Sequence, residues 1–185
     1  MASLFAEQLP ALSNNQQELI SILDFGCGTG LTSLACCNTI SKDGRSTIRQ
    51  VALVDHFQYF VADAAGTIRF NSSAVQDVVG CPLNLLNTTT TEVERQLTTE
   101  LGQWKRRLVV AQQLLTDIPF EQHHLQLRLW RNWVDTNGYL VVDIPHPQGR
   151  ISGFWIGRRG KSVDLGPTDE TFFALDRPSM WVEAS

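Results

Sequence analysis

Residues 19–30 read LISILDFGCGTG, and this stretch decides the fold. Its first five residues form a short apolar run, which predicts a buried strand. Three alternating glycines then predict a tight turn, and Leu31, Leu34 and Ala35 recur beyond it at helical spacing. A glycine turn between a strand and a helix lets a small molecule approach the backbone, because no Cβ intervenes and the first helix N–H groups are open donors. The stretch therefore predicts a ligand-binding unit.

The glycine spacing narrows the class of ligand. A dinucleotide fingerprint, Gly-x-Gly-x-x-Gly, needs a glycine where Leu31 stands, and a P-loop needs Lys and Ser/Thr where Leu31 and Thr32 follow. The pattern that remains, Asp-x-Gly-x-Gly-x-Gly, resembles the cofactor loop of class I S-adenosylmethionine-dependent methyltransferases. An acid beside the turn suits that cofactor, which carries an ammonium and a sulfonium but no phosphate. The resemblance implies five cofactor-binding residues here: Asp24, Gly26, Cys27, Gly28 and Gly30. A glycine turn without a ligand is the alternative.

A second acidic residue ends the next apolar run. Residues 50–54 predict a strand, and Asp55 follows it, 25 positions beyond Gly30. In nucleoside-binding α/β folds, an acid about 20 residues past the glycines accepts hydrogen bonds from the ribose hydroxyls. The resemblance implies the same role for Asp55. An aspartate that caps the following helix is the alternative.

The middle of the chain offers two candidates for the third strand, residues 67–70 and residues 83–86. We expect the second, because an α/β alternation requires a strand just before the helix that begins near Thr91. A helix over residues 56–65 precedes both. Asn87 then ends the third strand, where the family often places a polar residue that contacts adenine. An ordinary loop asparagine is the alternative for Asn87.

The helix after this strand carries a start signal and an apolar face. Residues 91–94, TEVE, have the Ser/Thr-x-x-Glu form of a capping box. Apolar side chains then recur on one face, at Val93, Leu97, Leu101 and Trp104. Residues 107–111 predict the fourth strand, and we expect Gln112, at its end, to contact the cofactor.

A further helix and strand continue the alternation. Leu125, Leu129 and Trp133 predict a core-facing helical stripe, and the Asn-Gly pair at 137–138 predicts its stop. Residues 139–144 then predict a buried fifth strand.

The two ends of the chain depart from the family's usual pattern. A short segment takes the place of the N-terminal helices that usually cover cofactor and substrate. Residues 154–157 and 161–164 predict a small hairpin in place of the usual final antiparallel pair, with edge elements at residues 172–175 and 180–182.

Methyl transfer needs little acid–base chemistry, because the sulfonium already activates the methyl group and the protein mainly aligns the reactants. A base assists where the acceptor is a hydroxyl or an ammonium. The candidates are Asp117, His123, His124 and His146. Residues 116–120, TDIPF, loosely resemble the Asp-Pro-Pro-Tyr/Phe loop with which amino-methylating members hold a planar nitrogen, although Ile118 replaces the first proline. We favour the alternative, a turn in which Asp117 caps the helix through His123.

Composition limits the remaining classes. With 185 residues, of which 43% are hydrophobic, the chain suits one globular domain. A net charge of −4 disfavours nucleic acid and anionic membranes as partners, and we expect the basic clusters at 105–107 and 158–161 to be solvated. The four cysteines form neither a disulfide framework nor a zinc spacing, so we expect a reducing compartment and no metal. With no basic residue before Lys42 and no long apolar run, we expect a cytoplasmic protein without membrane spans.

These patterns predict an α/β fold with a doubly wound, mainly parallel sheet of the Rossmann-like methyltransferase type, lacking part of the usual N-terminal cover and C-terminal strands. We expect residues 1–17 to form a short lead and residues 18–185 a single methyltransferase-like domain. The resemblance implies an S-adenosylmethionine-dependent methyltransferase acting on a small-molecule or protein acceptor. Two alternatives stay open: a catalytically inactive domain that binds a partner, and an NAD-dependent oxidoreductase, against which Leu31 counts.

Overall fold

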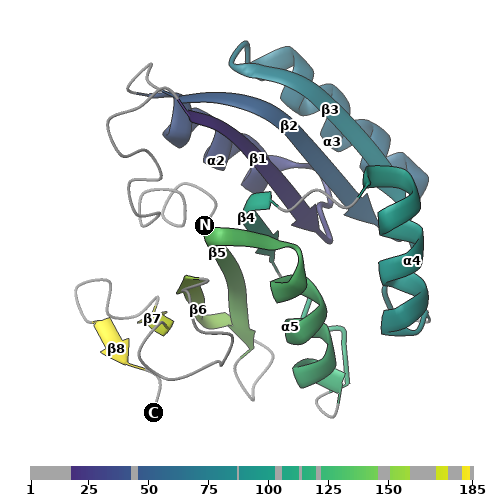
Figure 1. Ribbon diagram of the computed structural model, residues 1–185, viewed down its shortest axis with the longest axis vertical. Coiled ribbons are helices and arrows are strands. Elements are labelled where there is room, and N and C mark those ends of the chain that lie inside the picture. Colours follow the sequence, from purple (N-terminus) through teal and green to yellow (C-terminus); the bar gives the residue numbers. More distant parts are fainter. Residues whose placement is uncertain are drawn as a thin grey trace.

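An eight-stranded sheet with helices on both faces of its parallel half forms the framework of the chain (Figure 1). The computed structural model describes residues 18–42, 46–86, 88–102, 106–112, 114–119, 122–145, 151–158, 170–174 and 181–183. The strands are β1 (Glu18–Phe25), β2 (Ser46–Asp55), β3 (Val75–Pro82), β4 (Arg106–Ala111), β5 (Val134–Pro145), β6 (Ile151–Arg158), β7 (Glu170–Ala174) and β8 (Trp181–Glu183). The helices are α2 (Leu31–Ser41), α3 (Gln58–Asn71), α4 (Thr90–Leu101) and α5 (His123–Asn132).

The strand order is β3-β2-β1-β4-β5-β6-β7-β8. Strands β1 to β5 run parallel to one another, and β6, β7 and β8 continue the sheet in antiparallel pairs. The order reverses at β1, which lies between β2 and β4. In open α/β sheets ligands bind outside the carboxyl ends of the strands at such a reversal. We therefore expect a ligand to bind next to the segment after Phe25.

The two faces of the sheet bury different helices, because alternate residues of a strand point in opposite directions. Helices α2 and α3 pack on the face that carries Ile20, Ile22 and Val51. Helices α4 and α5 pack on the face that carries Leu23 and Phe25. The prediction of a doubly wound, mainly parallel sheet is confirmed.

The prediction for the third strand is wrong. Residues 67–70 lie inside α3, whose buried side chains Val61, Ala64, Ala65 and Ile68 recur at helical spacing. Residues 83–86 follow the third strand, β3, which begins at Val75. Because β3 is an edge strand, residues such as Gln76 and Asp77 are exposed, and the strand lacks the continuous apolar run that marks β1 and β2. Asn87 therefore does not end the third strand.

The helix after β3 begins two residues earlier than its capping box predicted. Thr89, rather than Thr91, is the N-cap, and its side chain accepts a hydrogen bond from the Glu92 N–H. Thr89 and Glu92 thus occupy the first and last positions of a Ser/Thr-x-x-Glu motif. The predicted apolar face is confirmed for Val93, Leu97 and Leu101, whereas Trp104 lies outside the described residues.

The predicted apolar stripe of α5 is confirmed at Leu129 and Trp133, which are buried, and one leucine at the start of each of α2 and α5 is exposed instead. Leu31 is 59% exposed and Leu125 is 42% exposed. In α5 the buried positions are Gln126, Leu129 and Trp130, and the Trp130 ring contacts Phe25 with a centroid distance of 5.9 Å. Among the helices that the structure describes, none combines the length and apolarity that a membrane span requires.

The Asn-Gly pair at 137–138 was predicted to end α5 before the fifth strand, and this prediction is wrong. Strand β5 begins at Val134 and continues through the pair, and residues 135–138 lie opposite Arg107 alone in the register with β4. The pair is therefore accommodated as a bulge, which is a common place for glycine in a strand.

The C-terminal strands form a meander. The prediction that residues 154–157 pair with residues 161–164 in a hairpin is wrong, because residues 154–157 lie in β6, which pairs with β5 on one side and β7 on the other. Residues 161–164 lie outside the described part of the chain. The predicted edge elements correspond to β7 and β8.

Candidate functional site

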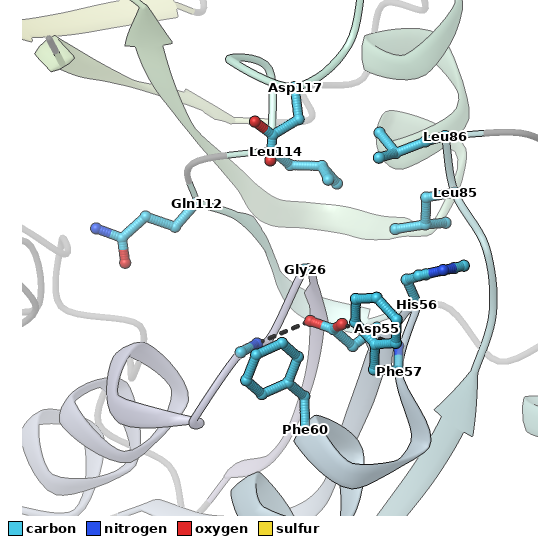
Figure 2. Close-up of a pocket in the computed structure, with 11 residues that line it drawn as sticks. Gly26, Asp55, His56, Phe57, Phe60, Leu85, Leu86, Gln112, Leu114 and Asp117 are labelled. Carbon is cyan, nitrogen blue, oxygen red and sulfur yellow. Dashed lines mark hydrogen bonds between the residues drawn. The ribbon is translucent and has the colours of Figure 1, made fainter. Parts of the chain in front are cut away.

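A pocket of about 330 Å³ opens at the carboxyl ends of the parallel strands (Figure 2). Its volume falls within the range of ordinary small-molecule sites, about 300–1,000 Å³. Four segments line it: the loop after β1, the end of β2 with the start of α3, the loop after β3 and the loop after β4. The lining residues are Gly26, Gly28, Asp55, His56, Phe57, Phe60, Leu85, Leu86, Gln112, Leu114 and Asp117.

The three glycines of the loop after β1 have different functions. All three adopt left-handed backbone conformations, with φ of 68° at Gly26, 49° at Gly28 and 77° at Gly30. A Cβ at Gly30 would lie 2.8 Å from the Ala64 Cβ and 2.9 Å from its Cα, so Gly30 lets α2 approach α3. A Cβ at Gly28 would meet no protein atom within 4 Å. Gly28 thus leaves room for a ligand, whereas Gly30 is required for helix packing.

Asp55 bonds to the glycine loop from the end of β2. Its Oδ2 accepts a hydrogen bond from the Gly28 N–H at 2.9 Å, which Figure 2 marks with a dashed line. Its Oδ1 accepts from the Phe57 N–H at 3.3 Å. The N-cap of α3 is Phe57, without a side-chain capping bond. Asp55 therefore holds the glycine loop, which follows β1, against the end of β2, and its carboxylate lines the pocket.

Asp24 lies beneath the loop and is 1% exposed. Its Oδ2 accepts a hydrogen bond from the Ser33 hydroxyl at 2.6 Å, which ties the end of β1 to the first turns of α2. It is absent from the described lining of the pocket, as are Cys27 and Gly30. The geometry gives Asp24 a supporting position under the loop.

Three buried cysteines, Cys27, Cys37 and Cys81, hold their thiols in the neutral form. Burial, together with the charges of Asp24 and Asp55, raises the pKa of Cys27 well above its usual range. Burial and Asp24 raise the pKa of Cys37 to about 12, and burial with Glu100 raises that of Cys81 to about 11. Because the thiolate is the nucleophilic form, none of these three is poised for covalent catalysis at neutral pH.

An aromatic group at the start of α3, which the sequence analysis did not single out, forms one side of the pocket. His56, Phe57 and Phe60 line it, and Tyr59 extends the group outward. Ring centroids are 4.3 Å apart between His56 and Phe57 and 6.0 Å apart between Phe57 and Phe60. The signal in the sequence that could have identified these residues is their position directly after Asp55, at the end of the predicted strand.

The segment after β4 forms the opposite side of the pocket. The Thr32 hydroxyl, in the first turn of α2, donates to Oε1 of Gln112. Leu114 is buried, and the Asp117 N–H donates to its carbonyl at 3.2 Å, which closes a turn. Asp117 itself is exposed and lines the pocket. Gln112 and Asp117 therefore share a site with the glycine loop and Asp55.

Of the other catalytic candidates, the structure describes the side chain of His123 alone. The His123 Nε2 lies 2.8 Å from the Ile118 carbonyl oxygen, and His123 is absent from the described lining. The N-cap of α5 is Gln122, without a side-chain capping bond, so the prediction that Asp117 caps this helix is wrong. Asn87, His146 and the His124 side chain lie outside what the structure describes. Within the described residues, no three metal-ligating side chains gather at one point.

The sequence matches no family model and no curated protein. Solved structures do resemble the fold. Haemonchus contortus phosphoethanolamine N-methyltransferase 1, solved with phosphoethanolamine and S-adenosylhomocysteine, is 14% identical, with a TM-score of 0.52 over 80% of this chain and 26% of that one. The S-adenosylmethionine-dependent methyltransferase SibL is 15% identical, with a TM-score of 0.53 over 80% of this chain and 36% of its own.

A third neighbour is an O-methyltransferase family 2 protein from Planctomyces limnophilus, solved in complex with apigenin. It is 14% identical, with a TM-score of 0.51 over 78% of this chain and 39% of that one. The chain thus spans between 26% and 39% of the length of these three proteins. Together with the sheet order described above, these similarities show that the chain has the Rossmann-like fold of the class I S-adenosylmethionine-dependent methyltransferases.

Proposed function

We propose that the chain binds S-adenosylmethionine in the pocket at the glycine loop and transfers its methyl group to an acceptor. The observation that carries this proposal is the open space at Gly28 beside the Asp55 carboxylate. A Cβ there would fill part of the pocket without touching the protein, as expected of a backbone position that a ligand approaches. We further propose that residues 18–185 form one domain with this function.

The hydrogen bonds of the loop favour a cofactor without phosphate. Four of its backbone N–H groups already donate within the protein: Gly26 and Cys27 to the Val54 carbonyl, Gly30 to the Cys27 carbonyl, and Gly28 to Asp55. A diphosphate at the Gly28 amide would lie against the Asp55 carboxylate, and the two negative charges would repel. This arrangement disfavours a dinucleotide and is compatible with a cationic sulfonium cofactor.

Asp55 retains the capacity to bind a ribose. A carboxylate has about four acceptor positions on its two oxygens, and the Gly28 and Phe57 amides use two of them. Two remain for the vicinal hydroxyls of a ribose. The adenine would then extend toward Phe57 and Leu85, where aromatic and aliphatic side chains offer an apolar slot.

The cofactor, when bound, supplies a methyl group on a positively charged sulfur, which activates that methyl toward a nucleophile. The protein's contribution is then to hold the acceptor in line and exclude water, and such positioning can supply about 7–11 kcal/mol. Gln112 and Asp117 are the described polar side chains on the β4 side of the pocket. A domain with this fold that binds a partner without catalysis is the competing function, and the experiments below separate the two.

Asp55→Ala is expected to weaken cofactor binding by about 1.5–3 kcal/mol, the usual contribution of hydrogen bonds to a charged group. Because Gly28 and Phe57 also lose an acceptor, we expect the unliganded protein to lose about 1 kcal/mol of stability as well. Isothermal titration with S-adenosylhomocysteine and a denaturant melt measure the two effects separately. A loss of stability with unchanged affinity would assign Asp55 to the loop alone.

Calorimetric titration of the protein with S-adenosylhomocysteine, and in parallel with NADH, tests the proposed cofactor. We expect S-adenosylhomocysteine to bind and NADH to give no heat above dilution. Binding should stabilise the fold by about 2.7 kcal/mol at a hundredfold excess of ligand over Kd. Release of S-adenosylhomocysteine from S-adenosylmethionine in the presence of an acceptor would then establish catalysis. Binding of neither ligand would reject the proposed function and favour the partner-binding one.

A further inference from the structure

We propose that Thr32 is a positioning residue, which holds the Gln112 carboxamide so that the site selects a cofactor with a carboxylate. This inference rests on the proposed function and adds the residue that sets this selectivity. Three observations carry it: the hydrogen bond between Thr32 and Gln112, the donors that this bond leaves open, and the charge of the pocket.

The bond between Thr32 and Gln112 joins two segments that are 80 positions apart in the chain. Thr32 stands in the first turn of α2, which begins directly after the glycine loop, and Gln112 directly follows β4. The Thr32 hydroxyl donates to the Gln112 Oε1. Gln112 lines the pocket, whereas Thr32 is absent from the described lining. Thr32 therefore acts on a bound ligand through Gln112.

The bond fixes which end of the Gln112 carboxamide is available to a ligand. A carboxamide has a carbonyl oxygen that accepts hydrogen bonds and an amino group that donates two. Because Oε1 accepts from Thr32, the amino group at Nε2 is left, and no residue that the structure describes accepts a hydrogen bond from it. A side chain that is oriented before binding also loses less conformational entropy when a ligand binds. Gln112 thus offers two prearranged donors to a ligand group that accepts hydrogen bonds.

Gln112 lies on the side of the pocket where the amino-acid part of the cofactor is expected. The proposed binding mode puts the ribose at Asp55 and extends the adenine toward Phe57 and Leu85. Figure 2 shows Gln112 on the opposite side of Gly26 from Phe57. An extended cofactor would therefore direct its α-ammonium and α-carboxylate groups toward Gln112.

The charge of the pocket decides which of these two groups needs Gln112. Asp55 and Asp117 line the pocket, and none of the lining residues in the described part of the chain is a lysine or an arginine. The two carboxylates attract the α-ammonium and repel the α-carboxylate. Four backbone N–H groups of the glycine loop already donate within the protein, and the His56 ring lies against Phe57 at the adenine side. The α-carboxylate therefore depends on the N–H donors of Gln112.

Two ligands that differ by one carboxylate test the inference: S-adenosylhomocysteine and its decarboxylated form, S-adenosyl-3-thiopropylamine. Calorimetric titration gives the Kd of each ligand for the parent protein and for each variant. We expect the parent protein to bind S-adenosylhomocysteine at least about tenfold more tightly than the decarboxylated ligand, because a hydrogen bond to a charged group accounts for a difference of that size.

Thr32→Val removes the hydroxyl and keeps the shape of the side chain. It should weaken binding of S-adenosylhomocysteine about fivefold to tenfold and leave binding of the decarboxylated ligand unchanged, because only the carboxylate uses the orientation of Gln112. Thr32→Ser keeps the hydroxyl and should behave like the parent protein. Thr39→Val is the matched control, since Thr39 lies in the same helix and its hydroxyl has no hydrogen-bond partner among the described residues.

Gln112→Glu tests the orientation of the carboxamide without altering Thr32. A carboxylate in place of the amide would repel the carboxylate of the ligand. We expect S-adenosylhomocysteine to bind more than about tenfold more weakly, whereas the decarboxylated ligand, which carries only the ammonium, should lose no affinity.

Three results would overturn the inference while leaving the proposed cofactor in place. The first is equal affinity of the parent protein for the two ligands. The second is a Thr32→Val variant that keeps its affinity for S-adenosylhomocysteine or loses affinity equally for both ligands, because Thr32 would then have a structural role alone. The third is tighter binding of S-adenosylhomocysteine to Gln112→Glu, because the carboxamide would then face the ammonium. If the parent protein does not bind S-adenosylhomocysteine at all, the proposed function fails and this inference fails with it.

Discussion

Gly28→Val is expected to remove all of the stability gained from S-adenosylhomocysteine, about 2.7 kcal/mol at a hundredfold excess over Kd, from a protein that still folds. The side chain would enter space where no protein atom lies within 4 Å of the Cβ, so it obstructs the ligand rather than the core. The left-handed φ of 49° adds a backbone cost of about 1–2 kcal/mol that is present with or without ligand. Thermal melts with and without ligand measure both effects.

The parent protein should melt about 5–10 °C higher with the ligand, because 1 kcal/mol corresponds to about 2–4 °C in a domain of this size. Gly28→Val should melt at one temperature in both conditions. Gly66→Ala is a suitable control, because Gly66 is exposed on α3 and a Cβ there meets no atom within 4 Å. A full ligand shift in Gly28→Val would contradict the assignment of this loop to the cofactor.

Gly30→Ala is expected to destabilise the unliganded fold by about 2–5 kcal/mol. Its Cβ would lie 2.8 Å from the Ala64 Cβ and 3.2 Å from the Ala64 carbonyl oxygen, so helix α2 would have to move away from α3. Overpacking of this kind costs about 1–3 kcal/mol, and the φ of 77° adds about 1–2 kcal/mol. Urea denaturation, with the free energy of unfolding extrapolated to water, measures the loss.

Gly66→Ala is the matched control for this substitution as well, since it adds the same methyl group to the helix that Gly30 contacts. We expect it to stabilise the protein by about 0.5–1 kcal/mol, because alanine is the better helix former. If Gly30→Ala has the stability of the parent protein, the close approach of α2 to α3 at Gly30 is not a constraint on the fold.

The parts of the fold that the sequence predicted well are those in which local pattern and tertiary burial agree. The apolar run before Asp24 and the run before Asp55 are both central strands, buried on two faces, so an uninterrupted apolar stretch was a reliable sign. The glycine loop and Asp55 were found in the same way, and the structure brings them together through the bond between Gly28 and Asp55.

The parts of the fold and of the site that were not predicted depend on interactions between segments distant in the sequence. Strand β3 lies at the edge of the sheet, so its sequence mixes exposed and buried residues and gives no clear strand pattern. The more apolar residues 83–86 were therefore mistaken for the strand. They belong to the loop after β3, where Leu85 and Leu86 line the pocket. The difference between Gly28 and Gly30 follows from the position of Ala64, more than thirty residues away, which no local pattern contains. The role of the aromatic group at His56, Phe57 and Phe60 likewise becomes visible once α3 is placed beside the loop.

The position of β1 between β2 and β4 has a consequence for the order of folding. Strands β1, β2 and β3 follow one another through α2 and α3, whereas β4 must reach β1 from much further along the chain. Loop closure therefore costs more entropy at the pairing of β1 with β4, from Ile22 opposite Leu108 to Phe25 opposite Ala111, and we expect this seam to form late. The pocket crosses the seam, with Asp55 on one side and Gln112 on the other. A bound ligand would thus join the two halves after they meet, and would slow unfolding far more than it hastens folding.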